Sequence, residues 1–186
     1  KLVVFPSATN KGELYGLEFV KVQGHFAARK NVNEARKVCA LALHYMRKHP
    51  DLSIGIVAMN RDQMVLMDDQ MHQIFQTDDL AADYREKWDK TIEPFIVKNL
   101  ENMQGDERDI VIISMTYGPD DSGRVMQRFG PITQANGHRR LNVLFTRAKY
   151  KMLVVSSMNP NDIRVTPTSS RGVRVMKEFL EYSATG

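Results

Sequence analysis

The sequence is poor in cysteine and has no long apolar run. Its only cysteine, Cys39, excludes a disulfide or a cysteine-based metal site within the chain. No apolar stretch approaches the roughly 18 residues that a membrane-spanning helix needs. The first ten residues, KLVVFPSATN, lack the basic start, apolar core and cleavage site of a secretory signal. These absences predict a cytoplasmic chain that does not cross a membrane.

Two common ligand-binding patterns are also missing. The segment GxxxxGK[ST], whose backbone cradles nucleotide phosphates, does not occur. None of the five histidines has the spacing of metal ligands. We therefore predict no bound metal, and no conventional triphosphate site formed by this chain alone.

The composition is that of a globular protein. Hydrophobic residues make up 42% of the chain and charged residues 26%, which excludes a disordered or membrane-embedded class. A length of 186 residues suits one compact domain, so residues 1–186 are predicted to form a single unit. The net charge of +4 agrees with a polyanionic partner, but acidic and basic residues are mixed, so charge alone does not establish one.

Strand and helix patterns alternate along the chain, which favours an α/β fold with a mainly parallel sheet. Short apolar runs typical of buried strands are Leu2–Phe5, Leu17–Val22, Ile54–Met59, Phe95–Val97, Ile110–Met115 and Met152–Ser156. Amphipathic stretches typical of helices are Asn31–His49, Arg61–Phe75, Leu80–Lys90, Arg139–Tyr150 and Arg171–Tyr182.

The first long helix and one long loop carry further local signals. Asn31 is predicted to cap that helix, with Glu34 at capping-box spacing, and Pro50 ends it. Residues Tyr117–Gly137 contain glycines, prolines and aspartates and predict a long loop. Long loops in compact domains are more often functional than idle.

A polar turn between two apolar runs is the first candidate site. In VKNLENMQGDERDIVIIS, residues 97–114, Gln104 and Gly105 stand at the junction. Ligands of open α/β sheets bind near the carboxyl ends of strands, where we expect this turn to lie. Gly105 permits a positive φ, and Glu107 could accept a hydrogen bond from a sugar hydroxyl. A solvated turn without a ligand is the alternative.

A helix-end arginine is the second candidate. In HRRLNVLFTRAKYKMLVVSS, residues 138–157, Arg147 follows the apolar face of a predicted helix. An arginine held there could reach a neighbouring nucleotide and stabilise charge on a transferring phosphoryl group. The alternative is that it only meets the helix dipole or a surface carboxylate.

Taken together, these segments resemble motifs of superfamily 1 helicases. QGDERD resembles the QGxExD form of motif V, and RRLNVLFTRAKY the RRLNVxxTRA form of motif VI, in the subgroup that includes the nonsense-mediated-decay helicase. SIGIVAMNRDQ is similar to motif IV of that subgroup. The run EPFIVKNLENMQGDERD, YGPD and the closing RGVRVMKEFLEY look like large bacterial multidomain helicases. The resemblance covers about residues 50–180.

The resemblance implies a RecA-like three-layer sandwich that serves as the second of two motor domains. The first RecA-like domain would then be its partner and would supply the phosphate loop and the magnesium carboxylate. ATP and Mg²⁺ would be held mainly by that domain, while this one closes over the nucleotide. Closing and opening would move the protein along single-stranded DNA or RNA, and this chain alone would be inactive.

Roles at the nucleotide carry over to the matching positions. Arg147 of TRA corresponds to the arginine that contacts the γ-phosphate. Gln104, Gly105 and Glu107 correspond to residues that couple nucleotide to nucleic acid.

A second catalytic arginine precedes the first long helix in the family. The pattern around it is matched by Arg29 together with Asn31, Glu34 and Ala35. The segment QGHFAARKN is shorter than in the family, which leaves Lys30 or a different residue as the alternative.

The resemblance implies nucleic-acid contacts at the end of motif IV, around Asn60 and Gln63, and in motif V, around Asn99 and Asn102. Uncharged contacts suit a strand that must slide, since many fixed ion pairs would hold it too tightly.

Two other functions are weighed against the motor. A RecA-like scaffold that has lost motor function is the main alternative, and the retention of Arg147 and Glu107 argues against it. A phosphate loop and a DE-type magnesium motif encoded upstream would support the motor. A stand-alone nuclease would need clustered carboxylates with a lysine at metal-binding spacing, and the acidic pairs lack that pattern.

Overall fold

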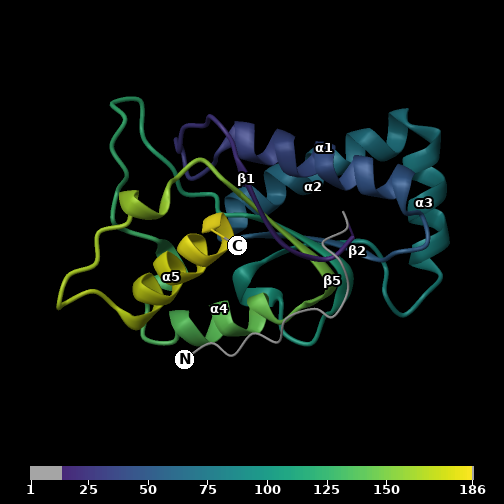
Figure 1. The fold of residues 1–186 in the computed structure, drawn as a ribbon. Coiled ribbons are helices and arrows are strands. Elements are labelled where there is room, and N and C mark those ends of the chain that lie inside the picture. Colours follow the sequence, from purple (N-terminus) through teal and green to yellow (C-terminus); the bar gives the residue numbers. More distant parts are fainter. Residues whose placement is uncertain (1–13, 186) are drawn as a thin grey trace.

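The computed structural model describes residues 14–185, and Figure 1 shows their fold. The strands are β1 (Gly16–Lys21), β2 (Ile54–Ala58), β3 (Ile96–Asn99), β4 (Arg108–Ser114) and β5 (Ala148–Ser156). The α-helices are α1 (Val32–Lys48), α2 (Arg61–Thr77), α3 (Asp79–Asp89), α4 (Gly137–Phe145) and α5 (Arg171–Thr185). The predicted strand Leu2–Phe5 lies outside the described residues. No helix within them has the length and apolar character to cross a bilayer.

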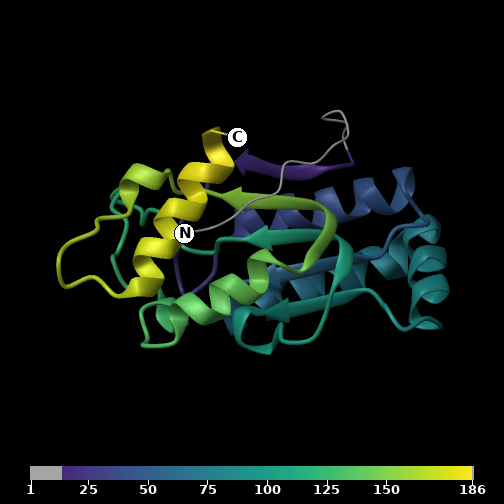
Figure 2. The ribbon, with the colours of Figure 1, turned by 60° about the horizontal axis from the view of Figure 1, so that its bottom comes forward.

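The strands form one five-stranded sheet in the order β1-β5-β4-β2-β3. Every neighbouring pair is parallel, which confirms the predicted parallel sheet. Strands β2 and β4 are buried along their whole length, as expected for strands covered on both faces. Because all strands run the same way, the sheet has a distinct amino edge and carboxyl edge (Figure 2).

Helices cover both faces of the sheet, so the three-layer arrangement is confirmed. Along β4, Ile110 and Ile112 join a core with α1, α2 and α3, while Val111 and Ile113 join a second core with α4 and α5. Successive side chains of a strand point to opposite faces, which is why one apolar run serves two cores. Figure 1 shows the two groups of helices on either side of the sheet.

The helix predicted over Arg139–Tyr150 is shorter, and this prediction was wrong at its end. Helix α4 stops at Phe145 with Thr146 as its C-cap, and β5 begins at Ala148. The backbone N–H of Arg108 donates to the carbonyl of Arg147 at 3.0 Å, so pairing with β4 already starts there. Ladder hydrogen bonds to the neighbouring strand replace a further helical turn. The apolar spacing of the segment does not reveal this.

The loop Tyr117–Gly137 is present as predicted, with internal structure of its own. It contains an isolated bridge between Pro119 and Val125 and a 3₁₀ turn, Gly130–Ile132. The loop follows the carboxyl end of β4 and is anchored by Phe129, whose side chain is fully buried.

The connection from β3 to β4 crosses the sheet from one edge to the other. Since the two strands run parallel, the chain must leave β3 at the carboxyl edge and enter β4 at the amino edge. Leu100 and Met103 of this connection pack in the core beneath α4 and α5. The expectation that the whole QGDERD turn lies at the carboxyl edge is therefore wrong, because Arg108 within it begins β4 at the amino edge.

Candidate functional site

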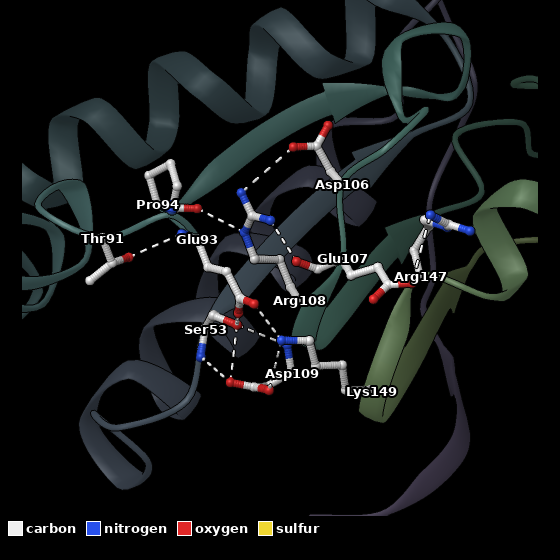
Figure 3. A network of polar contacts seen from close by, with 10 residues as sticks. All are labelled: Ser53, Thr91, Glu93, Pro94, Asp106, Glu107, Arg108, Asp109, Arg147 and Lys149. Atoms are coloured by element: carbon white, nitrogen blue, oxygen red, sulfur yellow. Dashed lines mark hydrogen bonds and ion pairs between the residues drawn. The ribbon is translucent and has the colours of Figure 1, made fainter.

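Arg147 stands at the amino edge, between the end of α4 and the start of β5. Its Nε donates to the carbonyl of Val143 at 2.9 Å, and its Nη2 donates to Thr146 Oγ1 at 3.0 Å. Its Nη1 lies 3.8 Å from Glu107 Oε1, and its side chain is 20% exposed (Figure 3). One side of the guanidinium is therefore held by the helix end, while the other faces an exposed carboxylate.

The turn that carries Glu107 has the backbone expected of it. Gly105 has φ +89°, and no atom lies within 4 Å of where a Cβ would stand. Gln104, Gly105 and Glu107 are exposed. Asp106 is half-buried instead and forms an ion pair with Lys98. The three residues that the motif resemblance singles out are thus exposed on the surface of the turn.

Arg108 ties the backbone of this turn to the sheet (Figure 3). Its side chain is buried, its Nε donates to the carbonyl of Pro94 at 2.8 Å, and its Nη1 donates to the carbonyl of Glu107 at 2.5 Å. A buried guanidinium that bonds two carbonyls leaves the turn little freedom to move relative to β3 and β4.

A polar cluster beside Arg147 was missed by the sequence analysis. Asp109 Oδ2 accepts from the backbone N–H of Ser53 at 2.8 Å, and Ser53 Oγ lies 2.7 Å from Glu93 Oε2. Lys149 pairs with Glu93 and lies 3.9 Å from Asp109 (Figure 3). The hydrogen bond between Lys149 and Glu93 raises the pKa of Lys149 and lowers that of Glu93, so both side chains stay charged. Glu93 and Lys149 are 56 positions apart, which no local pattern links.

Asn60 and Asn99 lie at the carboxyl edge, where each begins a helical turn. Asn60 Oδ1 accepts from the backbone N–H of Gln63 at 2.8 Å, and Asn99 Oδ1 accepts from that of Asn102 at 3.1 Å. Asparagine at an N-cap satisfies a helix N–H that has no partner within the helix. Asn60 and Asn99 are each 6% exposed, whereas Asn102 is exposed.

Gln63 is buried beneath that edge rather than displayed on it. Its Oε1 accepts from the N–H of Asn31 at 2.8 Å, and its Nε2 donates to the carbonyl of Asn31 and to Ser114 Oγ at 2.9 and 3.1 Å. With no exposed surface, it offers no group to a nucleic acid in this conformation. Its amide fastens the start of α1 to the end of β4.

Glu34 is a second buried group, which the sequence analysis placed in a helix cap and in the pattern around the second arginine. Its carboxylate accepts from the backbone N–H groups of Thr116 and Ser157 at 2.6 and 2.7 Å and from Ser114 Oγ at 2.8 Å. Burial raises the pKa of Glu34 to about 7, against the opposing effect of these hydrogen bonds. The expected bond to the backbone N–H of Asn31 is replaced, because that N–H donates to Gln63.

The structure does not bring Arg29 and Arg147 together. Arg29 follows β1 at the carboxyl edge, has φ +64°, and pairs with Asp62 at 2.5 Å. Its carbonyl accepts from Asn60 Nδ2 at 3.0 Å, so it belongs with the carboxyl-edge residues. The seven residues of β4 separate the two edges by about 20 Å at roughly 3.3 Å per residue. The same holds for Lys30, which directly follows Arg29.

Comparison with known proteins places the chain in context. A family described as "AAA domain" matches residues 14–159. A Mycoplasma genitalium protein, "Uncharacterized ATP-dependent helicase MG140", is 30% identical over 184 residues, which is 97% of this chain and 16% of that protein. Its Mycoplasma pneumoniae homolog is 29% identical over 186 residues, 98% of this chain and 16% of that protein. The chain thus spans about one-sixth of the length of these relatives.

A solved structure with a similar outline was also found. It is the C-terminal domain of a possible DNA helicase from Lactobacillus plantarum WCFS1, with TM-score 0.40 and 15% sequence identity. The match covers 84% of this chain and 83% of that one, and similarity at this level establishes no function.

Proposed function

Because the chain belongs to the AAA domain family through residues 14–159, we propose that it is the second motor domain of an ATP-dependent superfamily 1 helicase. The resemblance to helicases seen in the motifs is confirmed by the family match and by relatives named as ATP-dependent helicases. The activity of the whole protein remains our proposal, since this chain spans 16% of each relative.

In this proposal the amino edge faces the nucleotide. The observation that carries it is Arg147, held by Val143 and Thr146 on one side and open toward exposed Glu107 on the other. A guanidinium in that position can neutralise charge that develops on the γ-phosphate. Gln104 and Gly105 lie in the same exposed turn as Glu107 and would approach the nucleotide beside it.

ATP and Mg²⁺ would be held mainly by the first RecA-like domain, across the cleft from Arg147. Within residues 14–185, no group of three histidine, cysteine, aspartate or glutamate side chains is arranged to hold a metal ion. When bound there, ATP supplies the phosphoryl group, and this chain contributes charge stabilisation and closure over the site.

The carboxyl edge would contact single-stranded DNA or RNA. Exposed Asn102 lies there, and its amide side chain suits contacts that must be made and broken as a strand slides. Asn60 and Asn99, each 6% exposed, would contribute mainly by shaping the turns at this edge. Arg29 lies at this edge too, so we assign it to the nucleic-acid side and leave Arg147 as the arginine of this chain that reaches the nucleotide. Gln63 would act indirectly, by holding α1 and α2 in place.

The test is nucleic-acid-stimulated ATP hydrolysis by the parent protein that contains this chain, with and without Arg147→Ala. We expect hydrolysis to fall by roughly 10³-fold while nucleotide binding is retained. Arg147→Lys should remain strongly impaired, because lysine keeps the charge but not the planar fork. Arg85→Ala, which removes an exposed ion-paired arginine on α3, is the matched control and should hydrolyse ATP at the wild-type rate.

The non-catalytic scaffold is the second candidate, and one observation favours it. The contacts of Arg147 with Val143 and Thr146 are also those of a residue that only caps a helix end, worth less than about 1 kcal/mol. A parent protein without stimulated hydrolysis, or with hydrolysis indifferent to Arg147→Ala, would establish the scaffold and reject the motor.

A further inference from the structure

Some basic side chains of residues 14–185 pair with a carboxylate, at both edges of the sheet, whereas others form no ion pair within these residues, among them exposed Arg36, Arg61, Arg139 and Arg171. The pairs near α3 and the amino edge are Arg47 with Asp78, Arg85 with Asp89, Lys87 with Asp51, Lys90 with Glu86, Lys98 with Asp106 and Lys149 with Glu93. Three exposed arginines beyond the carboxyl edge form no ion pair within the described part of the chain: Arg124, Arg128 and Arg164.

These arginines come from two loops that are bonded to each other. Gln127 Nε2 donates to the carbonyl of Asp162 at 3.0 Å, and Gln127 Oε1 accepts from the backbone N–H of Arg164 at 2.8 Å. One loop follows β4 and the other follows β5, so both extend the carboxyl edge. Figure 1 shows them together at the end of the molecule away from α3. Gln127 therefore places Arg164 beside the segment that carries Arg124 and Arg128.

The carboxylates of the same two loops have other neighbours. Asp120 Oδ1 accepts from Ser122 Oγ, from the backbone N–H of Ser122 and from that of Arg124 at 2.6, 2.9 and 3.0 Å, bonds that lower the pKa of Asp120. Asp162 Oδ2 accepts from the N–H of Asn159 at 2.7 Å, and Asp121 lies 3.3 Å from His25. These carboxylates accept hydrogen bonds within their own loops or lie near His25, and none of them forms an ion pair with Arg124, Arg128 or Arg164.

We propose that Arg124, Arg128 and Arg164 form an arginine surface that binds the phosphate backbone of a nucleic acid. This inference rests on the proposed function and extends its strand-binding edge beyond Asn60 and Asn99. One guanidinium group can donate two hydrogen bonds to the oxygens of one phosphate, and such contacts do not depend on base sequence. A nucleic acid is favoured over an acidic protein because the surface continues the edge that carries exposed Asn102 and that the proposed function assigns to the strand.

The test uses a triple variant of the parent protein, Arg124→Ala with Arg128→Ala and Arg164→Ala. Within residues 14–185 none of the three side chains forms a hydrogen bond or an ion pair, so folding should be retained. We expect the affinity for a fluorescein-labelled oligothymidylate, measured by anisotropy, to fall about 10²-fold. The slope of log K against log salt should decrease by about 2, since each phosphate contact on a single strand contributes about 0.7.

A charge-matched control is Arg85→Ala with Lys87→Ala and Lys90→Ala on α3. It removes the same positive charge from side chains that are already paired, and its affinity and salt slope should match those of the wild type. An equal loss in both triple variants would mean that only net charge matters, and it would overturn the arginine surface.

The result is separable from the test of Arg147. Loss of the arginine surface should raise the oligonucleotide concentration that gives half-maximal stimulation, whereas Arg147→Ala should lower the maximal rate. Wild-type affinity and salt slope in the Arg124 triple variant would reject the inference even if the Arg147 result supports the motor. A labelled polyglutamate that binds more tightly than oligothymidylate, and loses this affinity in the Arg124 triple variant, would assign the surface to an acidic protein and also reject the inference.

Discussion

At the scale of single residues, Glu34 shows how one side chain connects elements that are distant in sequence. It accepts hydrogen bonds from groups at the ends of β4 and β5 while standing in the first turn of α1. Ser157 is 123 positions away. A fully buried carboxylate is costly to keep charged, and this cost exceeds the effect of its hydrogen bonds on its pKa.

The raised pKa of Glu34 predicts a pH-dependent stability. The folded state retains a proton that the unfolded chain releases near pH 4.5, so the free energy of unfolding should fall between about pH 4.5 and about pH 7. The loss should be about 3 kcal/mol, and Glu34→Gln should remove this part of the profile. Urea unfolding of the wild type and of Glu34→Gln across this pH range measures the loss of stability.

Parallel pH profiles of stability for the wild type and Glu34→Gln would contradict this prediction.

Glu93 affects stability in a different pH range, because the hydrogen bond from Lys149 lowers its pKa. The stability it contributes is present above its unfolded pKa and is lost as pH falls through its folded value.

At the scale of elements, α4 and α5 meet over the carbonyl of Ile132. A Cβ at Gly137 or Gly172 would stand 2.0 or 2.1 Å from that oxygen. Phe145 of α4 stacks on Phe179 of α5 with ring centroids 3.5 Å apart. Glycine at both helix starts therefore permits this close approach.

Gly172→Ala should destabilise the domain by about 1–3 kcal/mol, because the new methyl group displaces backbone rather than a flexible side chain. Helix propensity alone predicts the opposite sign, a gain of up to about 1 kcal/mol. The midpoint of urea unfolding decides between them. Glu178→Ala, at an exposed position of the same helix, is the control and should leave the midpoint nearly unchanged.

At the scale of the whole molecule, one sheet separates two edges with different chemistry. Arg147 and Glu107 lie at the amino edge, and Asn60, Asn99 and Arg29 lie at the carboxyl edge. Strands β4 and β5 run directly between the two. In the proposed motor, a rigid sheet of this kind would transmit closure at the nucleotide to the side that binds the strand.

The isolated 186-residue chain should release phosphate from ATP no faster than buffer does, since it has no phosphate loop. Hydrolysis should appear only in the parent protein or after addition of a domain that carries that loop. A phosphate-release assay on the purified chain measures this. Hydrolysis by the chain alone that is abolished by Arg147→Ala would show that it holds the nucleotide without a partner.

Much of the fold follows from local patterns. The β2 and β4 strands and the α1 and α2 helices were predicted to within about two residues at most of their ends, because buried runs and amphipathic periods are strong signals. The end of α4 was not, since strand pairing at Arg147 overrides the helical spacing.

The sequence by itself determined the α/β class, the order of the elements and the motifs that point to a helicase motor domain. Those properties depend on residues close together in the chain. Tertiary structure alone decided which edge each residue occupies, because parallel strands force the β3–β4 connection across the sheet. It also decided that Gln63 is buried, that Arg29 and Arg147 lie apart, and that Gln127 joins two loops. Each of these depends on contacts between segments whose separation in sequence carries no signal.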